Sequence, residues 1–135
     1  MLSGSTHLSL LVKDYDEALE WYTQKLGLEL RSNLEWSDVL SQYGQDYRWV
    51  TVSVKGQNDV EVVLHKPYEQ EEGELEPLIG KTPGFVFGID DCYAEVEQLR
   101  TKGVRIAREP ETVPWGIQAS LEDLYGNIHV LVEPP

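Results

Sequence analysis

The chain repeats one order of elements, and this repeat constrains its fold more than any other feature. Each copy has an apolar strand, an acidic helix cap, a helix that stops at glycine, and a second strand. The copies occupy residues 5–31 and 84–108. The spacing from cap to glycine is 13 residues between Asp14 and Gly27 and 12 residues between Asp91 and Gly103. A period of about 77 residues is too long for a solenoid repeat and too short for two independent domains. The sequence therefore predicts one α+β domain made of two βαβββ modules.

Helix and turn signals divide each module further. Asp14 with Glu17 forms a start that resembles a capping box, and Gly27 and Gly103 supply left-handed stops. Two alternating strands should follow each helix unit, at 48–54 and 60–65 in the first module and at 116–121 and 128–132 in the second. We expect a single domain over 1–135, with module one at about 1–67, an acidic linker at about 68–81 and module two at about 82–135. Residues 33–47, which include Trp36, Tyr43 and Tyr47, are interpreted as a loop or short helix over the pocket.

The charge of the chain excludes several classes of partner. The net charge of −13 argues against binding to nucleic acid or to an anionic membrane, and it favours a cationic ligand if it has a binding role. Part of the excess of negative charge lies between the modules, in a cluster of glutamates. The segment that contains them has no apolar period, which indicates a solvated linker. The cluster comprises Glu69, Glu71, Glu72, Glu74 and Glu76. The single Cys92 cannot form an intrachain disulfide, and no secretory signal or membrane-spanning run is visible, which favours a cytoplasmic protein.

Four stretches of the chain, in their order, resemble the vicinal oxygen chelate superfamily of glyoxalase I, the fosfomycin and bleomycin resistance proteins and the extradiol dioxygenases. The stretches are His7–Asp14, Ala18–Leu30, Phe87–Asp91 and Asp123–Asn127. The resemblance implies paired βαβββ modules whose mixed sheets curl around a cavity. It also implies a homodimer, because relatives often complete the cavity with a second chain.

The resemblance further implies positions for metal ligands. His7 matches the first-strand histidine of metal-dependent relatives, and Glu61 matches the glutamate of the last strand in the first module. In the second module Gly84 stands at the histidine position, and a count from the Gly126-Asn127 turn puts Val130 at the glutamate position. Two of four ligands are then present, and a catalytic divalent site usually needs three or more. We therefore expect no tightly held cofactor, although a divalent metal stays open.

His129 leaves a second interpretation open. A shift of one residue would turn His129 to the opposite face of its strand and complete a metal cluster with His7 and Glu61. The alternation of Ile128, Val130 and Val132 is compatible with either register. A histidine on an apolar strand is more often a hydrogen-bonded structural residue than a ligand. Glu61 is more informative, because an unpaired carboxylate that faced an apolar interior would be costly.

The leading hypothesis is a small-molecule-binding protein of the glyoxalase/bleomycin-resistance type with a degenerate metal site. Its pocket would be lined by aromatic side chains, for which the candidates are Trp36, Trp49, Trp115 and Tyr125. One alternative is a metal-dependent lyase, isomerase or dioxygenase that uses His7, Glu61 and His129. Others are a drug-sequestering resistance protein and a metal-free enzyme in which His7 and Glu61 form the catalytic acid–base pair. The substrate cannot be read from the sequence.

Overall fold

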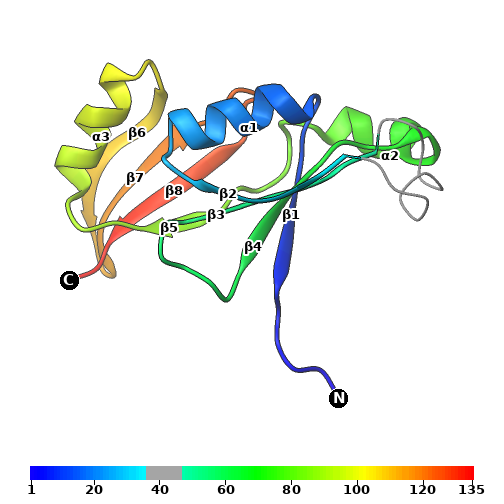
Figure 1. The fold of residues 1–135 in the computed structure, drawn as a ribbon. Helices are drawn as coiled ribbons and strands as arrows, with labels where there is room; N and C mark the ends of the chain where they lie inside the picture. The colour runs from blue at the N-terminus through cyan, green and yellow to red at the C-terminus, as the bar shows by residue number, and fades with distance from the viewer. Residues whose placement is uncertain (36–46) are drawn as a thin grey trace. The chain divides into compact units, whose positions relative to one another are not determined.

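The computed structural model of the chain describes residues 1–35 and 47–135. These residues form two compact units, Met1–Ile79 (unit 1) and Gly80–Pro135 (unit 2), and each contains one βαβββ series (Figure 1). The series of unit 1 is β1 (His7–Leu11), α1 (Tyr15–Gln24), β2 (Glu29–Leu34), β3 (Trp49–Ser53) and β4 (Glu61–His65). The series of unit 2 is β5 (Val86–Gly88), α3 (Cys92–Thr101), β6 (Arg105–Val113), β7 (Gly116–Glu122) and β8 (Ile128–Glu133).

The two units share one strand connectivity. Unit 1 has the order β1-β4-β3-β2 and unit 2 the order β5-β8-β7-β6. The first strand of each series pairs in parallel with the last, and the other pairs are antiparallel. The predicted α+β class with two βαβββ modules is therefore confirmed. Association of the two units into a single domain around a shared cavity stays a prediction.

The helices begin and end where the sequence predicted. The carboxylate of Asp14 accepts from the backbone N–H of Glu17 at 2.8 Å, and that of Asp91 accepts from Ala94 at 3.0 Å. Each bond satisfies one of the free amides of a first helical turn. Gly27 follows α1 with a φ of 73°, and Gly103 follows α3 with a φ of 81°. Only glycine adopts such a left-handed conformation at little cost, so both helices end there.

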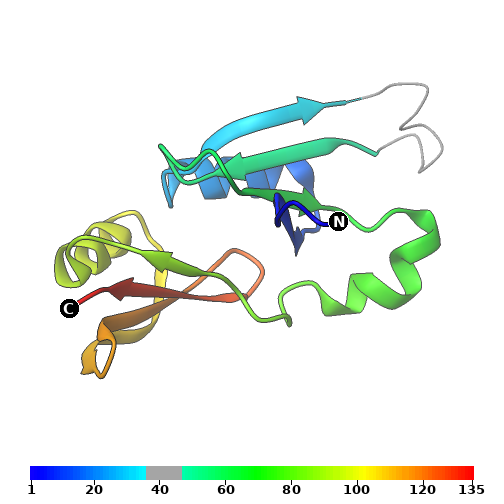
Figure 2. The same cartoon turned by 90° about the horizontal axis from the view of Figure 1, so that it is seen from below.

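The core of unit 1 lies between α1 and its sheet. Ala18 and Tyr22 on α1 are buried, as are Val50 and Val52 on β3 and Leu64 on β4. Figure 2 shows α1 along one side of the sheet. Because successive side chains of a strand point to opposite faces, Glu61, Val63 and His65 lie on the other side of β4. We call this side of the unit 1 sheet the open face.

Unit 2 has a corresponding core under α3. Its buried side chains come from the helix and from the facing sides of β7 and β8. They include Cys92, Val96, Leu99, Ala119, Leu121, His129 and Leu131. The opposite side of the unit 2 sheet carries Ile128 and Val130, which pair with Glu122 and Ser120.

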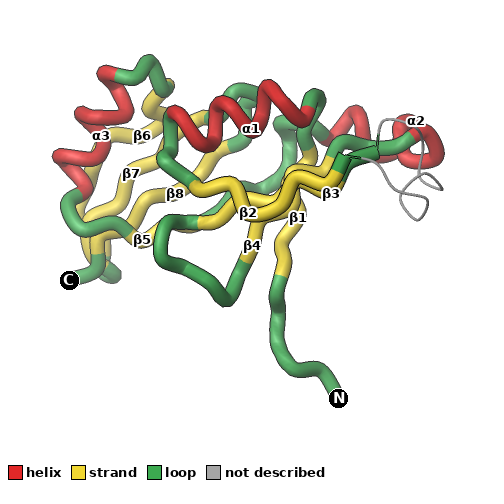
Figure 3. Tube along the Cα trace, in the orientation of Figure 1, coloured by secondary structure: helices red, strands yellow, loops and turns green. Residues whose placement is uncertain are grey.

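The acidic segment between the series is partly helical. It consists of three short elements, η2 (Glu69–Glu71), α2 (Glu72–Leu75) and η3 (Glu76–Leu78) (Figure 3). Four of its glutamates are exposed, as a solvated segment predicts, whereas Glu71 is half-buried. Among the described residues no helix is long and apolar enough to cross a membrane. Trp36 and Tyr43, assigned to a loop or short helix over the pocket, lie outside the described residues.

Candidate functional site

The open face of unit 1 carries a cluster of polar groups around Glu61. His7 and Glu61 are register partners in the parallel β1–β4 pair. The Nε2 atom of His7 lies 3.8 Å from Oε1 of Glu61, and the two side chains are 36% and 32% exposed. Thr51 on β3 donates its hydroxyl to the same Oε1 atom at 2.6 Å. Within the described residues, Oε2 of Glu61 has no protein partner, so it can meet a ligand.

This arrangement follows from strand alternation. Thr51 pairs with Val63 across β3 and β4, so Thr51 shares a face with Val63 and Glu61. Thr51 is fully buried, and its hydroxyl therefore needs an acceptor, which Glu61 supplies. The bond from Thr51 was not predicted from the sequence. The alternating pattern of Thr51 and Ser53 within an otherwise apolar strand is the signal that could have indicated it.

An aromatic group lies next to the polar cluster. The ring of Trp49 is 5.5 Å from the ring of His7, between centroids, with the planes tilted by 56°. The Nδ1 atom of His7 is 2.8 Å from the hydroxyl of Thr6. Of the predicted pocket aromatics, Trp49 belongs to the described part of unit 1 and lies beside His7. The cluster therefore combines an indole, an imidazole and a carboxylate on one accessible surface.

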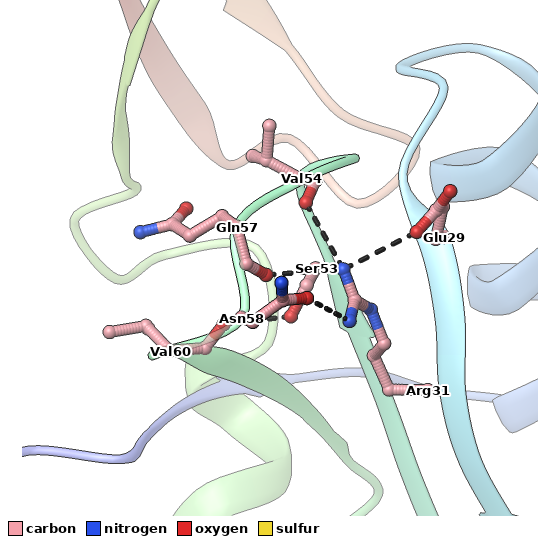
Figure 4. A network of polar contacts seen from close by, with 7 residues as sticks. All are labelled: Glu29, Arg31, Ser53, Val54, Gln57, Asn58 and Val60. Carbon is pink, nitrogen blue, oxygen red and sulfur yellow. Dashed lines mark hydrogen bonds and ion pairs between the residues drawn. The ribbon is translucent and has the colours of Figure 1, made fainter.

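Arg31 fixes the turn that leads into Glu61. Its guanidinium donates to the Asn58 side chain at 2.8 Å and to the Gln57 carbonyl at 3.1 Å, and it lies 3.3 Å from Glu29 (Figure 4). A planar group with several donors can hold two ends of a turn at once. Since β4 begins at Glu61, directly after this turn, Arg31 helps to set the position of the carboxylate. Arg31 was not identified from the sequence.

His129 is engaged inside unit 2. The side chain is fully buried, and its Nδ1 atom accepts from the backbone N–H of Phe85 at 2.9 Å. Its Nε2 atom lies 3.6 Å from Asp123, and its ring stacks on Phe85 at 5.4 Å between centroids. Both nitrogens thus face protein groups, and Val130 points to the opposite side of β8. His129 thus lies in the core under α3 and not on the side of β8 that carries Ile128 and Val130.

Gly84 is explained by close packing. A Cβ atom at this position would lie 2.1 Å from the carbonyl oxygen of Ile128 and 2.5 Å from Nδ1 of His129. No other residue type fits this approach without a backbone shift. The position that the resemblance matched to a histidine therefore holds a glycine, which lets the segment before β5 approach β8 closely.

The register also shows that the two inferred glutamate positions are not equivalent. Leu64 pairs with Leu10 in unit 1, and Leu131 pairs with Phe87 at the corresponding place in unit 2. Val130 therefore corresponds to Val63, and the counterpart of Glu61 is Ile128. The count from the Gly126-Asn127 turn gave Val130, which lies two residues beyond Ile128. Both residues are apolar, so the second module has no carboxylate at this position on either count.

The donor set of the described residues does not fit a metal centre within either unit. Among the described residues there is no group of three or more His, Cys, Asp or Glu side chains that could hold an ion. His7 and Glu61 supply two donors, whereas stable divalent sites use three or more. We therefore derive no chemical step through a metal.

The other predicted pocket aromatics are separated. Trp115 precedes β7 and Tyr125 follows it, so they lie at opposite ends of one strand. The Trp115 side chain is 56% exposed and donates to Gln118 at 2.8 Å. Unit 2 thus does not gather Trp115 and Tyr125 into one pocket, and Trp36 lies outside the described residues.

A second histidine–glutamate pair lies further along the open face. His65 Nε2 is 2.7 Å from Glu71 Oε1, and the rings of Tyr47 and Tyr68 contact the imidazole. Sequence reasoning did not identify this pair. The spacing of Glu61, Val63 and His65 at every second residue was the available signal, because it puts all three on one face.

A small cavity lies beside the acidic segment of unit 1. It has a volume of about 150 Å³ and is lined by Val12, Lys13, Lys66, Pro67, Glu72, Glu76 and Ile79. Ligand pockets for drug-sized molecules usually have volumes of about 300–1,000 Å³. This cavity is therefore too small to be the main ligand site.

Comparison with known proteins identifies the family. The profile of the Glyoxalase/Bleomycin resistance protein/Dioxygenase superfamily matches residues 4–130. The chain belongs to this superfamily. An uncharacterized protein of Shewanella frigidimarina (strain NCIMB 400) is 33% identical, with 98% of this chain and 95% of that protein covered. A probable lactoylglutathione lyase of Vibrio cholerae is 28% identical, with 82% of this chain and 74% of that protein covered.

Solved structures extend this superfamily assignment to the fold. The crystal structure of UcmS2 has a TM-score of 0.83 and 31% identity, and the match covers 98% of this chain and 99% of that one. TnmS3, an antibiotic binding protein from Streptomyces sp. CB03234, has a TM-score of 0.79 and 27% identity, with 99% and 98% covered. The mixed α+β fold predicted from the repeat is thus the fold of known superfamily members.

Proposed function

We propose that this superfamily member binds an aromatic small molecule on the open face of unit 1 and holds it without a metal. The observation that carries the proposal is Glu61, a carboxylate on an apolar strand that has one oxygen held by Thr51 and the other available. Trp49 beside His7 supplies a flat apolar surface for a ring. The similarity to an antibiotic binding protein supports a binding role of this kind.

The contacts of Glu61 support a role as a hydrogen-bond acceptor for a ligand. Its Oε1 atom accepts from the Thr51 hydroxyl at 2.6 Å and lies 3.8 Å from Nε2 of His7. A general base must come within about 2.6–3.2 Å of the substrate proton that it removes, and this distance is set when the substrate binds. His7 would add a second polar contact.

The test is a fragment titration that locates the bound probe. 2-(1-naphthyl)ethanol, a neutral aromatic alcohol, is titrated into 15N-labelled protein, and amide and indole NMR shifts are recorded. We expect shifts at Trp49, Thr51 and Glu61, and a roughly two- to tenfold weaker Kd in Trp49→Leu from lost ring contact. Trp115→Leu is the matched control, because Trp115 is exposed on unit 2. Shifts confined to other residues, or equal losses in both variants, would contradict the proposal.

A metal-dependent lyase is the second candidate, and the similarity to a probable lactoylglutathione lyase favours it. The purified protein is assayed for that activity with Ni, Zn, Mn and Fe added in turn. We expect no turnover that depends on both metal and Glu61. Metal-dependent turnover that Glu61→Gln abolishes would replace binding by catalysis as the function.

We further propose that the chain acts as a homodimer in the cytoplasm, with the two units in one domain. Several apolar side chains on edge strands are exposed, including Leu8 at 46%, Leu34 at 59% and Val86 at 68%. Exposed apolar edges are usually covered in the assembled protein. Light scattering at micromolar concentration should give about twice the 15.4 kDa chain mass. A mass of one chain would contradict the dimer.

A further inference from the structure

The small cavity beside the acidic segment has a lining that the proposed ligand site does not use. Its volume of about 150 Å³ corresponds to about five water molecules. Part of the lining comes from the apolar residues Val12, Pro67 and Ile79, and the rest comes from charged residues, two of each sign. The charged residues are Lys13, Lys66, Glu72 and Glu76. We call this cavity the charged cavity.

The pairing of β1 with β4 brings the two lysines together. The strands are parallel, and the backbone N–H of Val12 donates to the carbonyl of the last residue of β4 at 2.9 Å. Lys13 and Lys66 therefore both lie just beyond the carboxyl ends of these strands. Because side chains alternate along a strand, Lys66 points to the same side as Leu64, which faces α1. Its ammonium accordingly lies 6.0 Å from the ring centre of Tyr15 on α1, away from the open face.

The two glutamates of the charged cavity lie on one helical turn of the acidic segment. Glu76 donates its backbone N–H to the carbonyl of Glu72, so the two residues have the spacing of neighbours on one helix face. Like charges at this spacing destabilise a helix. A cationic group bound between the two carboxylates would remove this repulsion, so the turn is suited to hold one.

The four charges line one cavity without neutralising one another. Among residues 1–35 and 47–135, no ion pair involves Lys13, Lys66, Glu72 or Glu76. Lys66 is half-buried, and the other three side chains are exposed. A guest in the charged cavity can thus meet two ammonium groups from the strand ends and two carboxylates from the acidic segment.

We propose that the charged cavity binds a small zwitterion, an α-amino acid of about the size of glycine or alanine. Its carboxylate lies between Lys13 and Lys66, and its ammonium lies between Glu72 and Glu76. The volume of the cavity excludes amino acids with large side chains. Because water screens contacts to exposed side chains, the binding is weak. This site is independent of the aromatic ligand proposed for the open face.

The experiment compares probes that carry one charge with probes that carry both. At about pH 7 glycine has both charges, whereas acetate has only the anionic group and methylamine only the cationic group. L-Phenylalanine has both charges and a side chain that is too large for the charged cavity. Each probe is titrated into 15N-labelled protein at constant ionic strength, and the shifts of the backbone amides are recorded.

We expect glycine to shift the amides of Lys13, Lys66 and Glu72 saturably, and to bind at least about fivefold more tightly than the other three probes. Glu72→Gln should weaken the binding of glycine about three- to tenfold. Glu74→Gln is the matched control, because it makes the same change in net charge in the same segment and Glu74 does not line the cavity. Lys66→Gln is a second variant that should weaken binding from the other side, with its fold checked by urea denaturation.

Several outcomes would overturn the inference. Equal losses of affinity in Glu72→Gln and Glu74→Gln would do so, because net charge alone would then explain the binding of glycine. Acetate or methylamine that binds the same residues as tightly as glycine would show that one charge is sufficient, and equally tight L-phenylalanine would show that the volume selects nothing. Glycine shifts that are absent, or confined to the open face around Trp49 and Glu61, would leave the charged cavity without a ligand.

Discussion

Units 1 and 2 have the same strand connectivity, but each carries a histidine on a different side of its sheet. In unit 1, His7 and Glu61 lie on the open face and are about one-third exposed. In unit 2, the histidine is His129, which is fully buried on the α3 side and bonded to Phe85. One βαβββ framework can therefore carry a histidine either as a candidate ligand contact or as part of its core.

Glycine at position 84 makes this difference possible. Because Gly84 has no Cβ, β5 approaches β8 closely enough for Phe85 to donate to His129. In unit 1 the corresponding position is His7, which instead faces Glu61 and Trp49. Unit 2 therefore has no side chain at the position of His7, and this absence allows the buried His129 to bond to the backbone of Phe85.

The largest expected effect tests the close approach of β5 to β8. Gly84→Ala should destabilise the protein by about 3 kcal/mol or prevent folding, because the new methyl would overlap a backbone carbonyl. Gly88→Ala, at the end of β5, is the control, since a Cβ there meets nothing within 4 Å. Urea denaturation measures both variants. Similar midpoints for the two would refute the packing account of Gly84.

The next effect contrasts the two histidines. His129→Leu should cost about 2 kcal/mol, because the buried Phe85 N–H loses its acceptor. His7→Leu should change the free energy of unfolding by less than about 0.5 kcal/mol, because the ring is partly exposed. Thermal or urea unfolding at neutral pH compares them. A larger loss of stability in His7→Leu than in His129→Leu would contradict a structural role for His129 and a surface role for His7.

The helix caps should show no difference between the units. Asp14→Ala and Asp91→Ala each remove one bond to a first-turn amide, and each should cost about 1 kcal/mol. The Asn variants at both positions should recover most of the stability, because Asn is an equally good N-cap. Calorimetry of the four variants checks this symmetry. A cost at one cap alone would show that the two helices contribute unequally to stability.

The smallest effect concerns the residue after each cap, which is Tyr15 in unit 1 and Cys92 in unit 2. Burial, followed by the nearby Glu133 and Asp91, raises the pKa of the Cys92 thiol above its ordinary value. The unfolded chain then loses the thiol proton at a lower pH than the folded chain. Stability should therefore fall as pH rises above about 9, and Cys92→Ser should lack this component. Urea midpoints between pH 8 and pH 10 measure it, and identical pH profiles would contradict it.

The sequence predicted one residue pair of the candidate site. The family resemblance identified His7 and Glu61, and the structure brings these side chains together, because an aligned parallel pair puts register partners on one face. Thr51, Arg31 and Glu71 were missed, since each makes its contact from another strand or from the acidic segment. Such contacts depend on how separate elements pack, and spacing along the chain does not record them.

The sequence by itself determined the repeat, the two helix caps, the glycine stops and the shared connectivity. These features depend on local chemistry, namely side-chain capping, left-handed backbone and hydrophobic period. Tertiary structure alone decided the surroundings of His129, the need for glycine at position 84 and the pairing of His65 with Glu71. The physical reason is that a hydrogen bond or a close approach between distant residues depends on distances of a few tenths of an ångström, which only the packed chain fixes.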